Sequence, residues 1–158
     1  MAVSSYWYAQ GKEKSADKQA GFLFGEAYTS EELLNLIDKD CICVASDGSA
    51  ILGYFLFDNY TSNATTKFYK QVLKGLVSNK KITPNRVCVR AQVAVHPDHQ
   101  NRGLSKRLTK FLSQQHKEKY DTIFSVVDRQ NPKMQVHISN NWKIVEQDEL
   151  YNYVLLEL

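Results

Sequence analysis

Apolar residues recur along this chain at helical spacing in some stretches and at strand spacing in others. A short amphipathic helix is predicted to begin at Thr29, because threonine is a good N-cap and Glu32 three residues later completes a capping box. We expect this helix to face the core with its leucines, Leu33 and Leu34. A second helix is predicted from a three-to-four-residue repeat that the turn 79–85 ends. Its apolar residues are Phe68, Val72, Leu76 and Val77.

Two further segments carry strand patterns separated by turn signals. The runs 41–45 and 51–57 are rich in Ile, Val, Tyr and Phe and flank Asp47-Gly48, a dipeptide typical of the positive φ angles of a type I′ turn. We therefore predict a hairpin there, and a closing hairpin from the runs 142–145 and 151–156. A short helix within 131–141 should begin at Pro132, because proline is favoured at a first helical position.

The segment from about Val87 to Val127 reads as a strand, a helix and a second strand. Apolar residues occupy every second position between 87 and 95, which predicts a strand with one fully apolar face that His96-Pro97 ends. The following helix, running to about Lys119, should bury one apolar stripe. That stripe consists of Leu104, Leu108, Phe111 and Leu112. A buried run at 122–127 then completes a crossover between parallel strands.

The composition indicates one ordered domain, 1–158, and the order of predicted elements places it in the mixed α/β class. With 43% hydrophobic residues, 158 residues suffice for one core but not for two ordinary domains. The chain starts without the basic flank and long apolar core of a signal peptide, and no apolar run is long enough to span a bilayer. We therefore expect a cytoplasmic protein with no membrane partner.

The cysteines and histidines do not suggest a metal site. Cys41, Cys43 and Cys88 form no even framework and lack the paired spacing of a zinc site, so we expect reduced cysteines in buried strands. His96 and His99 are three residues apart, but no third ligand accompanies them. No bound metal is predicted.

Positive charge is concentrated rather than abundant. The net charge of +3 comes from 20 basic and 17 acidic residues, too small an excess to indicate nucleic acid by itself. Five basic residues follow Gly103, where they either serve an anionic ligand or solvate a helix: Lys106, Arg107, Lys110, Lys117 and Lys119. The aromatic stacking motif and the helix-turn-helix spacing of nucleic-acid binders are absent from the sequence, so no nucleic-acid partner is expected.

The junction between the strand and the helix carries the most specific chemistry. A polar loop with one glycine, Gly103, leads into a basic helix, and unpaired N–H groups at a helix start are suited to hold a phosphate. The nucleotide P-loop and the dinucleotide motif require glycine patterns that this loop lacks. On spacing alone, a phosphate site and a plain helix start with surface charges are about equally well supported.

These residues resemble the central motif of the GNAT superfamily of N-acetyltransferases. That motif is a strand ending in Val-x-Pro, a Gln/Arg-x-x-Gly-x-Gly/Ala loop and a helix with leucines at fixed spacing. The segment Val95-His-Pro97 and the residues Gln100, Gly103 and Leu108 match it. Ser105 stands where the family has a second glycine or alanine, which is a mild departure because serine is still small.

The resemblance implies the GNAT fold, a mostly antiparallel central sheet with one parallel crossover and helices on both faces. It implies that acetyl-coenzyme A is the cosubstrate, with its pantetheine arm between the two parallel strands and its pyrophosphate on the loop. The cofactor-binding residues implied are Val93, Ala94, Val95, Gln100, Asn101, Arg102, Gly103, Leu104, Ser105, Lys106 and Asn131.

The resemblance also implies an acid in the short helix after the second parallel strand, where the family commonly has a tyrosine. Counting back from Asn141-Trp142, which stands in place of the family's Gly-Phe, the position falls on His137; counting forward from Asn131 it falls on Ile138. Isoleucine cannot donate a proton, whereas a histidine with a pKa near 6.5 can do so near neutral pH, so His137 is the predicted catalytic residue.

The implied reaction is direct attack by a primary amine of a small molecule or peptide on the thioester. A non-catalytic coenzyme A-binding regulatory module remains the alternative, because the same loop would serve both. A homodimer is compatible with the resemblance. Candidates for the acceptor site are five residues that either contact substrate or are structural: Arg90, Gln92, Trp7, Tyr54 and Tyr60.

Overall fold

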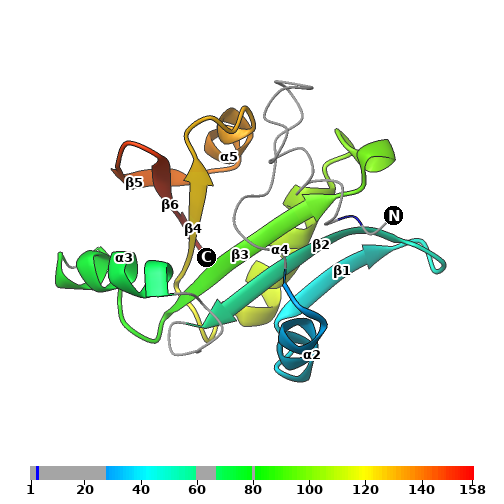
Figure 1. Cartoon of the computed structure of the whole chain (residues 1–158), viewed down its shortest axis with the longest axis horizontal. Coiled ribbons are helices and arrows are strands. Elements are labelled where there is room, and N and C mark those ends of the chain that lie inside the picture. The colour runs from blue at the N-terminus through cyan, green and yellow to red at the C-terminus, as the bar shows by residue number, and fades with distance from the viewer. Residues whose placement is uncertain (1–2, 4–27, 60–66, 80) are drawn as a thin grey trace.

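A computed structural model describes residue 3 and residues 28–59, 67–79 and 81–158. One six-stranded sheet organises these residues, with helices packed against it (Figure 1). The elements in chain order are α2 (Ser30–Asp38), β1 (Ile42–Ser46), β2 (Ile51–Asn59), α3 (Lys67–Ser78), β3 (Val87–Val95), the 3-10 helix η1 (Pro97–His99), α4 (Leu104–His116), β4 (Thr122–Asp128), α5 (Met134–Ser139), β5 (Lys143–Gln147) and β6 (Tyr151–Glu157).

The strands lie in the order β1-β2-β3-β4-β6-β5, and every neighbouring pair is antiparallel except β3 and β4. The predicted crossover and both hairpins are therefore confirmed. The parallel ladder is short, because it pairs only Val87–Val89 with Thr122–Phe124. Beyond these three pairs the two strands diverge (Figure 1), so the sheet is split at its centre.

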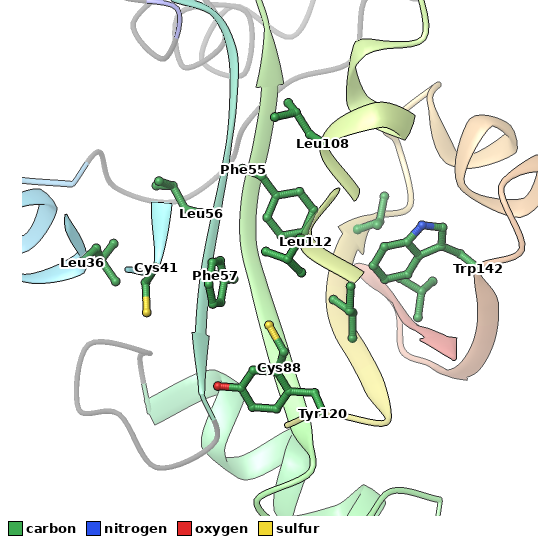
Figure 2. Packing of buried hydrophobic residues seen from close by; sticks show 13 residues of the cluster. Leu36, Cys41, Phe55, Leu56, Phe57, Cys88, Leu108, Leu112, Tyr120 and Trp142 are labelled. Carbon is green, nitrogen blue, oxygen red and sulfur yellow. The ribbon is translucent and has the colours of Figure 1, made fainter. Parts of the chain in front are cut away.

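Two apolar clusters cover the two faces of the sheet, as the prediction of helices on both faces requires. One cluster contains Leu108 and Leu112 of α4 with Phe55 of β2 and Trp142 (Figure 2). The other contains residues of α3 packed on β3, β4 and β6: Leu73, Leu76, Val89, Phe124 and Tyr153. Helix α4 crosses behind β2 and β3 in Figure 1, so the basic helix packs on the part of the sheet that lies on the β3 side of the split.

The helix starts agree with the sequence better than the helix faces do. Thr29 and Glu32 form the predicted capping box at α2. Leu36 is its buried residue, whereas Leu34 is 59% exposed, so the predicted leucine face is wrong for Leu34. The stripe of α4 is likewise wrong at Phe111, which is exposed. In both helices, the strip of residues that packs on the sheet is narrower than the apolar stripe of the sequence, so residues at the edge of the stripe stay exposed.

Two turns differ in detail from the prediction. Gly48 has a φ of +97°, but Asp47 does not have a positive φ, so the turn of the first hairpin is not type I′. Instead the Asp47 carboxylate accepts hydrogen bonds from the main-chain N–H groups of Ser49 and Ala50. Helix α5 starts at Met134 rather than Pro132, because residues 132 and 133 are taken up by the turn after β4.

The strand β3 is interrupted by a bulge. Leu56 pairs with Gln92 and Phe57 with Arg90, so one β3 residue, Ala91, has no partner on β2. A bulge of this kind shifts the side-chain alternation by one position. Val89 therefore packs in the α3 cluster while Ala91 packs in the α4 cluster. The predicted strand with one fully apolar face is wrong, because the apolar residues change face at the bulge.

The three cysteines are free thiols, as predicted. Cys41 and Cys88 are buried in the α4 cluster, and Cys43 is partly buried against it. Burial raises the pKa of the Cys43 thiol because it disfavours the charged thiolate.

Candidate functional site

The loop from β3 to α4 has an unusual backbone that its sequence supports. The 3-10 helix η1 follows β3, and His96 extends the hairpin by donating its main-chain N–H to the carbonyl of Leu52 at 2.7 Å. Asn101 (φ 58°) and Gly103 (φ 71°) then both adopt the left-handed conformation, which glycine adopts freely and asparagine tolerates better than most residues. These two residues turn the chain into α4.

Helix α4 begins without a side-chain cap. Gly103 is the N-cap, and no side-chain hydrogen bond caps this helix within the described part of the chain. The first main-chain N–H groups of the helix, together with its dipole, thus form a positive surface. The basic residues Arg102, Lys106 and Arg107 around it are all exposed. Leu104 is buried at 8% exposure, so only its main chain is available to a ligand.

A cleft of ≈ 430 Å³ lies between α4 and α5. Arg90 and Val93 of β3 line it, as do Trp142 and the last residues of β6. The cleft begins at the start of α4, since Ser105 and Lys106 line it too. The remaining lining residues from the two helices and the following turn include Thr109, Lys110, Ser113, Gln114, Lys117, Val136, His137, Ser139, Asn140 and Asn141.

The α4 wall of the cleft is built from small residues with lysines beside them. Thr109 donates its hydroxyl to the carbonyl of Ser105 at 2.9 Å, and Ser113 donates to the carbonyl of Thr109 at 2.9 Å. Because their hydroxyl groups bond back to the main chain of the helix, these small side chains do not extend far into the cleft. Lys106 and Lys110 lie along it, so at least part of the basic face borders the cleft rather than bulk solvent alone.

A buried arginine lies at the floor of this cleft. Arg90 is only 5% exposed, and its Nε donates to the hydroxyl of Ser125 on β4 at 3.0 Å. Its guanidinium carbon lies 4.1 Å from the centre of the Trp142 ring, in a cation–π contact. Ser125 in turn donates its hydroxyl to the carbonyl of Arg90 at 3.1 Å. Ser125 thus links β3 and β4 directly beyond the last pair of their ladder.

His137 reaches the same cluster from α5. Its Nδ1 lies 3.4 Å from a terminal nitrogen of Arg90, and its ring meets Trp142 edge to face with ring centres 6.0 Å apart. Ile138, the alternative position from the sequence, is 40% exposed and is not among the residues that line the cleft. The fold therefore brings His137 rather than Ile138 to the cleft.

The electrostatic environment of His137 differs from the one assumed in the sequence analysis. Burial, and then the positive charge of Arg90, lower the pKa of His137 to about 3. At neutral pH the ring is therefore neutral, and the premise of an unperturbed pKa near 6.5 is wrong. A proton-transferring role for His137 stays a prediction that has lost this support.

Other predicted site residues occupy different surroundings. Asn131 forms the turn after β4, where its side-chain oxygen accepts from the N–H of Lys133 at 3.0 Å, and it does not line the cleft. Arg90 and Gln92 do not share a face, because the bulge separates them. Tyr54 donates its hydroxyl to Gln92 at 3.0 Å. Trp7 and Tyr60, the other acceptor candidates, lie outside the described residues.

Three residues of the site were missed by the sequence analysis. Trp142 was read only as a substitute for a phenylalanine, and Ser125 as part of a buried run, although together they hold Arg90. Gly53 allows β2 to approach β3, because a Cβ atom there would lie 2.9 Å from the carbonyl oxygen of Ala94. A glycine within an apolar strand was the available signal for this close approach.

Within residues 28–59, 67–79 and 81–158, no helix has the length and apolar character needed to cross a membrane. The same part of the chain contains no group of three or more His, Cys, Asp or Glu side chains that could hold a metal ion.

The motif that resembles GNAT acetyltransferases includes the end of β3 and the uncapped start of α4, and residues of both line the cleft. The family model described as the acetyltransferase (GNAT) family matches residues 12–135. The chain therefore belongs to the GNAT acetyltransferase family and is an acyltransferase. The resemblance found in the loop is confirmed over most of the chain. Among curated proteins, no sequence matches it.

Solved structures share the fold at low sequence identity. A GNAT-family acetyltransferase from Listeria monocytogenes is 12% identical, with a TM-score of 0.69 over 98% of this chain and 83% of that one. The yncA protein of Salmonella typhimurium, solved with its cofactor acetyl-CoA, is 15% identical, with a TM-score of 0.63 over 98% and 86%. N-acetylglutamate synthase from Neisseria gonorrhoeae, complexed with coenzyme A and N-acetyl-glutamate, is 13% identical, with a TM-score of 0.66 over 99% and 31%.

Proposed function

We propose that this protein transfers an acetyl group from acetyl-coenzyme A to a primary amine of a small molecule or peptide by direct attack. The observation that carries the proposal is the uncapped start of α4, which opens into a cleft at the place where β3 and β4 diverge. A helix start with free N–H groups suits a pyrophosphate, and the adjoining cleft offers room for the arm attached to it.

The residues present fit this cofactor. The main chain of Asn101–Lys106 would hold the pyrophosphate, with charge supplied by the exposed side chains of Arg102 and Lys106. Val93 lines the cleft, so the β3 segment Val93–Val95 is suited to run beside the pantetheine arm. Asn131 lies in the turn after β4 and does not line the cleft, so its contact with the arm rests on the family resemblance alone. A protein of the same fold, yncA, was solved with acetyl-CoA, which supports the choice of ligand.

When bound, the thioester supplies an activated acyl group, and the protein's contribution is then mainly one of position. Holding an amine against a thioester in a fixed geometry converts a bimolecular reaction into one within a complex. The buried cluster of Arg90, Ser125 and Trp142 makes the floor of the cleft rigid. Its rigidity favours a well-defined position for whatever lies above it.

Binding is tested by thermal unfolding with and without acetyl-coenzyme A. A ligand at a hundred times its Kd stabilises the folded state by about 2.7 kcal/mol, so the unfolding temperature should rise. Gly103→Glu should abolish the rise, because it places a negative charge in the pyrophosphate site and strains a left-handed backbone. Gly48→Glu is the matched control, since Gly48 also has a positive φ and open space around it but lies in the turn between β1 and β2 and does not line the cleft.

The two glycine variants separate ligand loss from simple strain. If Gly103→Glu binds acetyl-coenzyme A as well as the native protein does, the cofactor lies elsewhere and the proposal fails. If both variants lose the ligand effect, the loss is a consequence of destabilisation and does not locate the site. We expect only the first variant to lose it.

Turnover distinguishes an enzyme from a coenzyme A-binding module. A panel of primary amines, including polyamines, amino acids and peptides with free N-termini, should be assayed for acceptor-dependent release of free coenzyme A. We expect release with at least one class. Binding of acetyl-coenzyme A without release across the panel would favour the non-catalytic module.

A further inference from the structure

The side chains of Arg90 and His137 are held in defined orientations by their contacts with Ser125 and Trp142. Arg90 is fixed from two sides, by the Ser125 hydroxyl at its Nε and by the face of Trp142. This leaves a terminal nitrogen of its guanidinium facing Nδ1 of His137 at 3.4 Å. His137 is itself held by its edge-to-face contact with Trp142.

The chemistry of these two groups determines where the histidine proton lies. A guanidinium nitrogen carries only N–H groups and cannot accept a hydrogen bond. The facing Nδ1 must therefore be the acceptor, so it carries no proton. A neutral imidazole with an unprotonated Nδ1 carries its single proton on Nε2.

We propose that Arg90 is a positioning residue that holds His137 as a neutral imidazole with its proton on Nε2, and that this N–H acts as a hydrogen-bond donor in the cleft. The catalytic role of this N–H rests on the proposed acetyl transfer, whereas the arrangement of Arg90 and His137 does not. In that reaction the donor would face the sulfur of the thioester. A neutral histidine serving as an electrophile rather than as an acid is known in other enzymes.

The step needs no proton from the histidine. A bond forms between the amine nitrogen and the acyl carbon, and the bond from that carbon to sulfur breaks with its electron pair remaining on sulfur. The proton lost by the amine leaves to water. His137 keeps its proton throughout and stabilises the charge that grows on sulfur through a hydrogen bond, while the Arg90 guanidinium adds positive charge behind it.

The other charged groups that line the cleft are Lys106 and Lys110 on α4, Lys117 directly after α4, and Glu157 on β6. Glu157 forms an ion pair with Lys143 at 2.8 Å. Burial, and then the adjacent charge of Arg90, lower the pKa of His137 and keep the ring neutral.

The state of the ring is tested by nitrogen-15 NMR of the histidine side chains, which requires no activity. The chain has four histidines, and the His137→Gln variant identifies the His137 signal by its loss. We expect the pattern of a neutral ring protonated on Nε2, unchanged from pH 8 to pH 5. Titration near pH 6.5, or a proton on Nδ1, would overturn the proposal even if acetyl transfer is confirmed.

Arg90→Met removes the guanidinium and keeps a side chain of similar volume. It tests whether Arg90 sets the protonation state of His137. The variant should show both neutral tautomers of His137 and titration at a higher pH than the native protein, because the positive charge and the donor are gone. Native NMR decides the ring state if this variant does not fold. A folded Arg90→Met protein whose His137 spectrum matches the native one would refute the role of Arg90.

Kinetics with an active acceptor test the donor itself. His137→Gln keeps an N–H donor but cannot supply a proton by titration, so it should retain kcat within about tenfold, whereas His137→Phe should lose on the order of a hundredfold. The KM for acetyl-coenzyme A should change little in both. Equal losses in the two variants would indicate proton transfer, and no loss in His137→Phe would remove the histidine from the reaction.

Discussion

At the scale of single residues, the basic residues around the start of α4 differ in whether they lie in the loop, line the cleft or do neither. Arg102, Lys106 and Arg107 are all exposed within six residues of one another. Lys106 lines the cleft, and Arg102 belongs to the loop, where it donates to Nδ1 of His99 at 3.4 Å. Arg107 is on the first turns of the helix but does not line the cleft. The three residues therefore offer a matched comparison.

Arg102→Ala and Lys106→Ala should each raise the KM for acetyl-coenzyme A by about threefold to tenfold, the effect of about 0.7–1.4 kcal/mol from a partly solvated phosphate contact. Arg107→Ala should leave it nearly unchanged. Steady-state kinetics with the cofactor varied provide the measurement. If acceptor preference changed while the cofactor KM did not, Arg102 and Lys106 would belong to the acceptor site.

At the scale of elements, α4 performs two tasks with two faces. One face packs Leu108 and Leu112 on the sheet (Figure 2), and another presents the small residues of the cleft wall. The neighbours Phe111 and Leu112 show how sharply the faces divide, since they are 53% and 1% exposed. Stability and ligand contact are thus separable along one helix.

Leu112→Ala should lower the free energy of unfolding by about 2–5 kcal/mol, because it leaves a cavity in a closed part of the core. Phe111→Ala, which removes a larger side chain, should change it by no more than about 0.5 kcal/mol. Urea denaturation of the two variants tests this ordering. Similar losses would mean that Phe111 is covered in solution by something outside the described residues.

At the scale of the whole molecule, three parallel pairs and the Ser125 bridge join two halves of a sheet. Both apolar clusters contain residues of β3 and β4, so each helical layer spans the split. We infer that the described parts unfold as one cooperative unit. A partly buried group such as His137 then affects the stability of the entire molecule.

The unfolding free energy should fall on acidification partly because of His137. Its pKa is about 3 in the folded state and near 6.5 in an unfolded chain, so the unfolded state binds more protons between these values. Stability therefore rises with pH through this window and declines as pH falls. Between pH 7 and pH 5 the contribution is about 2 kcal/mol. His137→Gln should lose less stability than the native protein over this range in urea titrations, and parallel curves would contradict the assignment.

Local patterns in the sequence determined most of the elements and the loop between β3 and α4. The capping box of Thr29, the two hairpins and the Gln100–Ser105 motif each depend on residues a few positions apart, so the chain specifies them without reference to distant segments. The same motif was sufficient to identify the GNAT family, which the family model confirms.

The tertiary structure alone decided the faces and the state of the buried charges. The bulge at Ala91 places Arg90 and Gln92 on opposite sides of the sheet, because alternation depends on pairing with β2 and not on β3 itself. The neutral state of His137 depends on its burial and then on the charge of Arg90, which is 47 residues away in sequence. Sequence spacing carries no measure of burial or of charge brought near by folding, and these are the quantities that set a pKa.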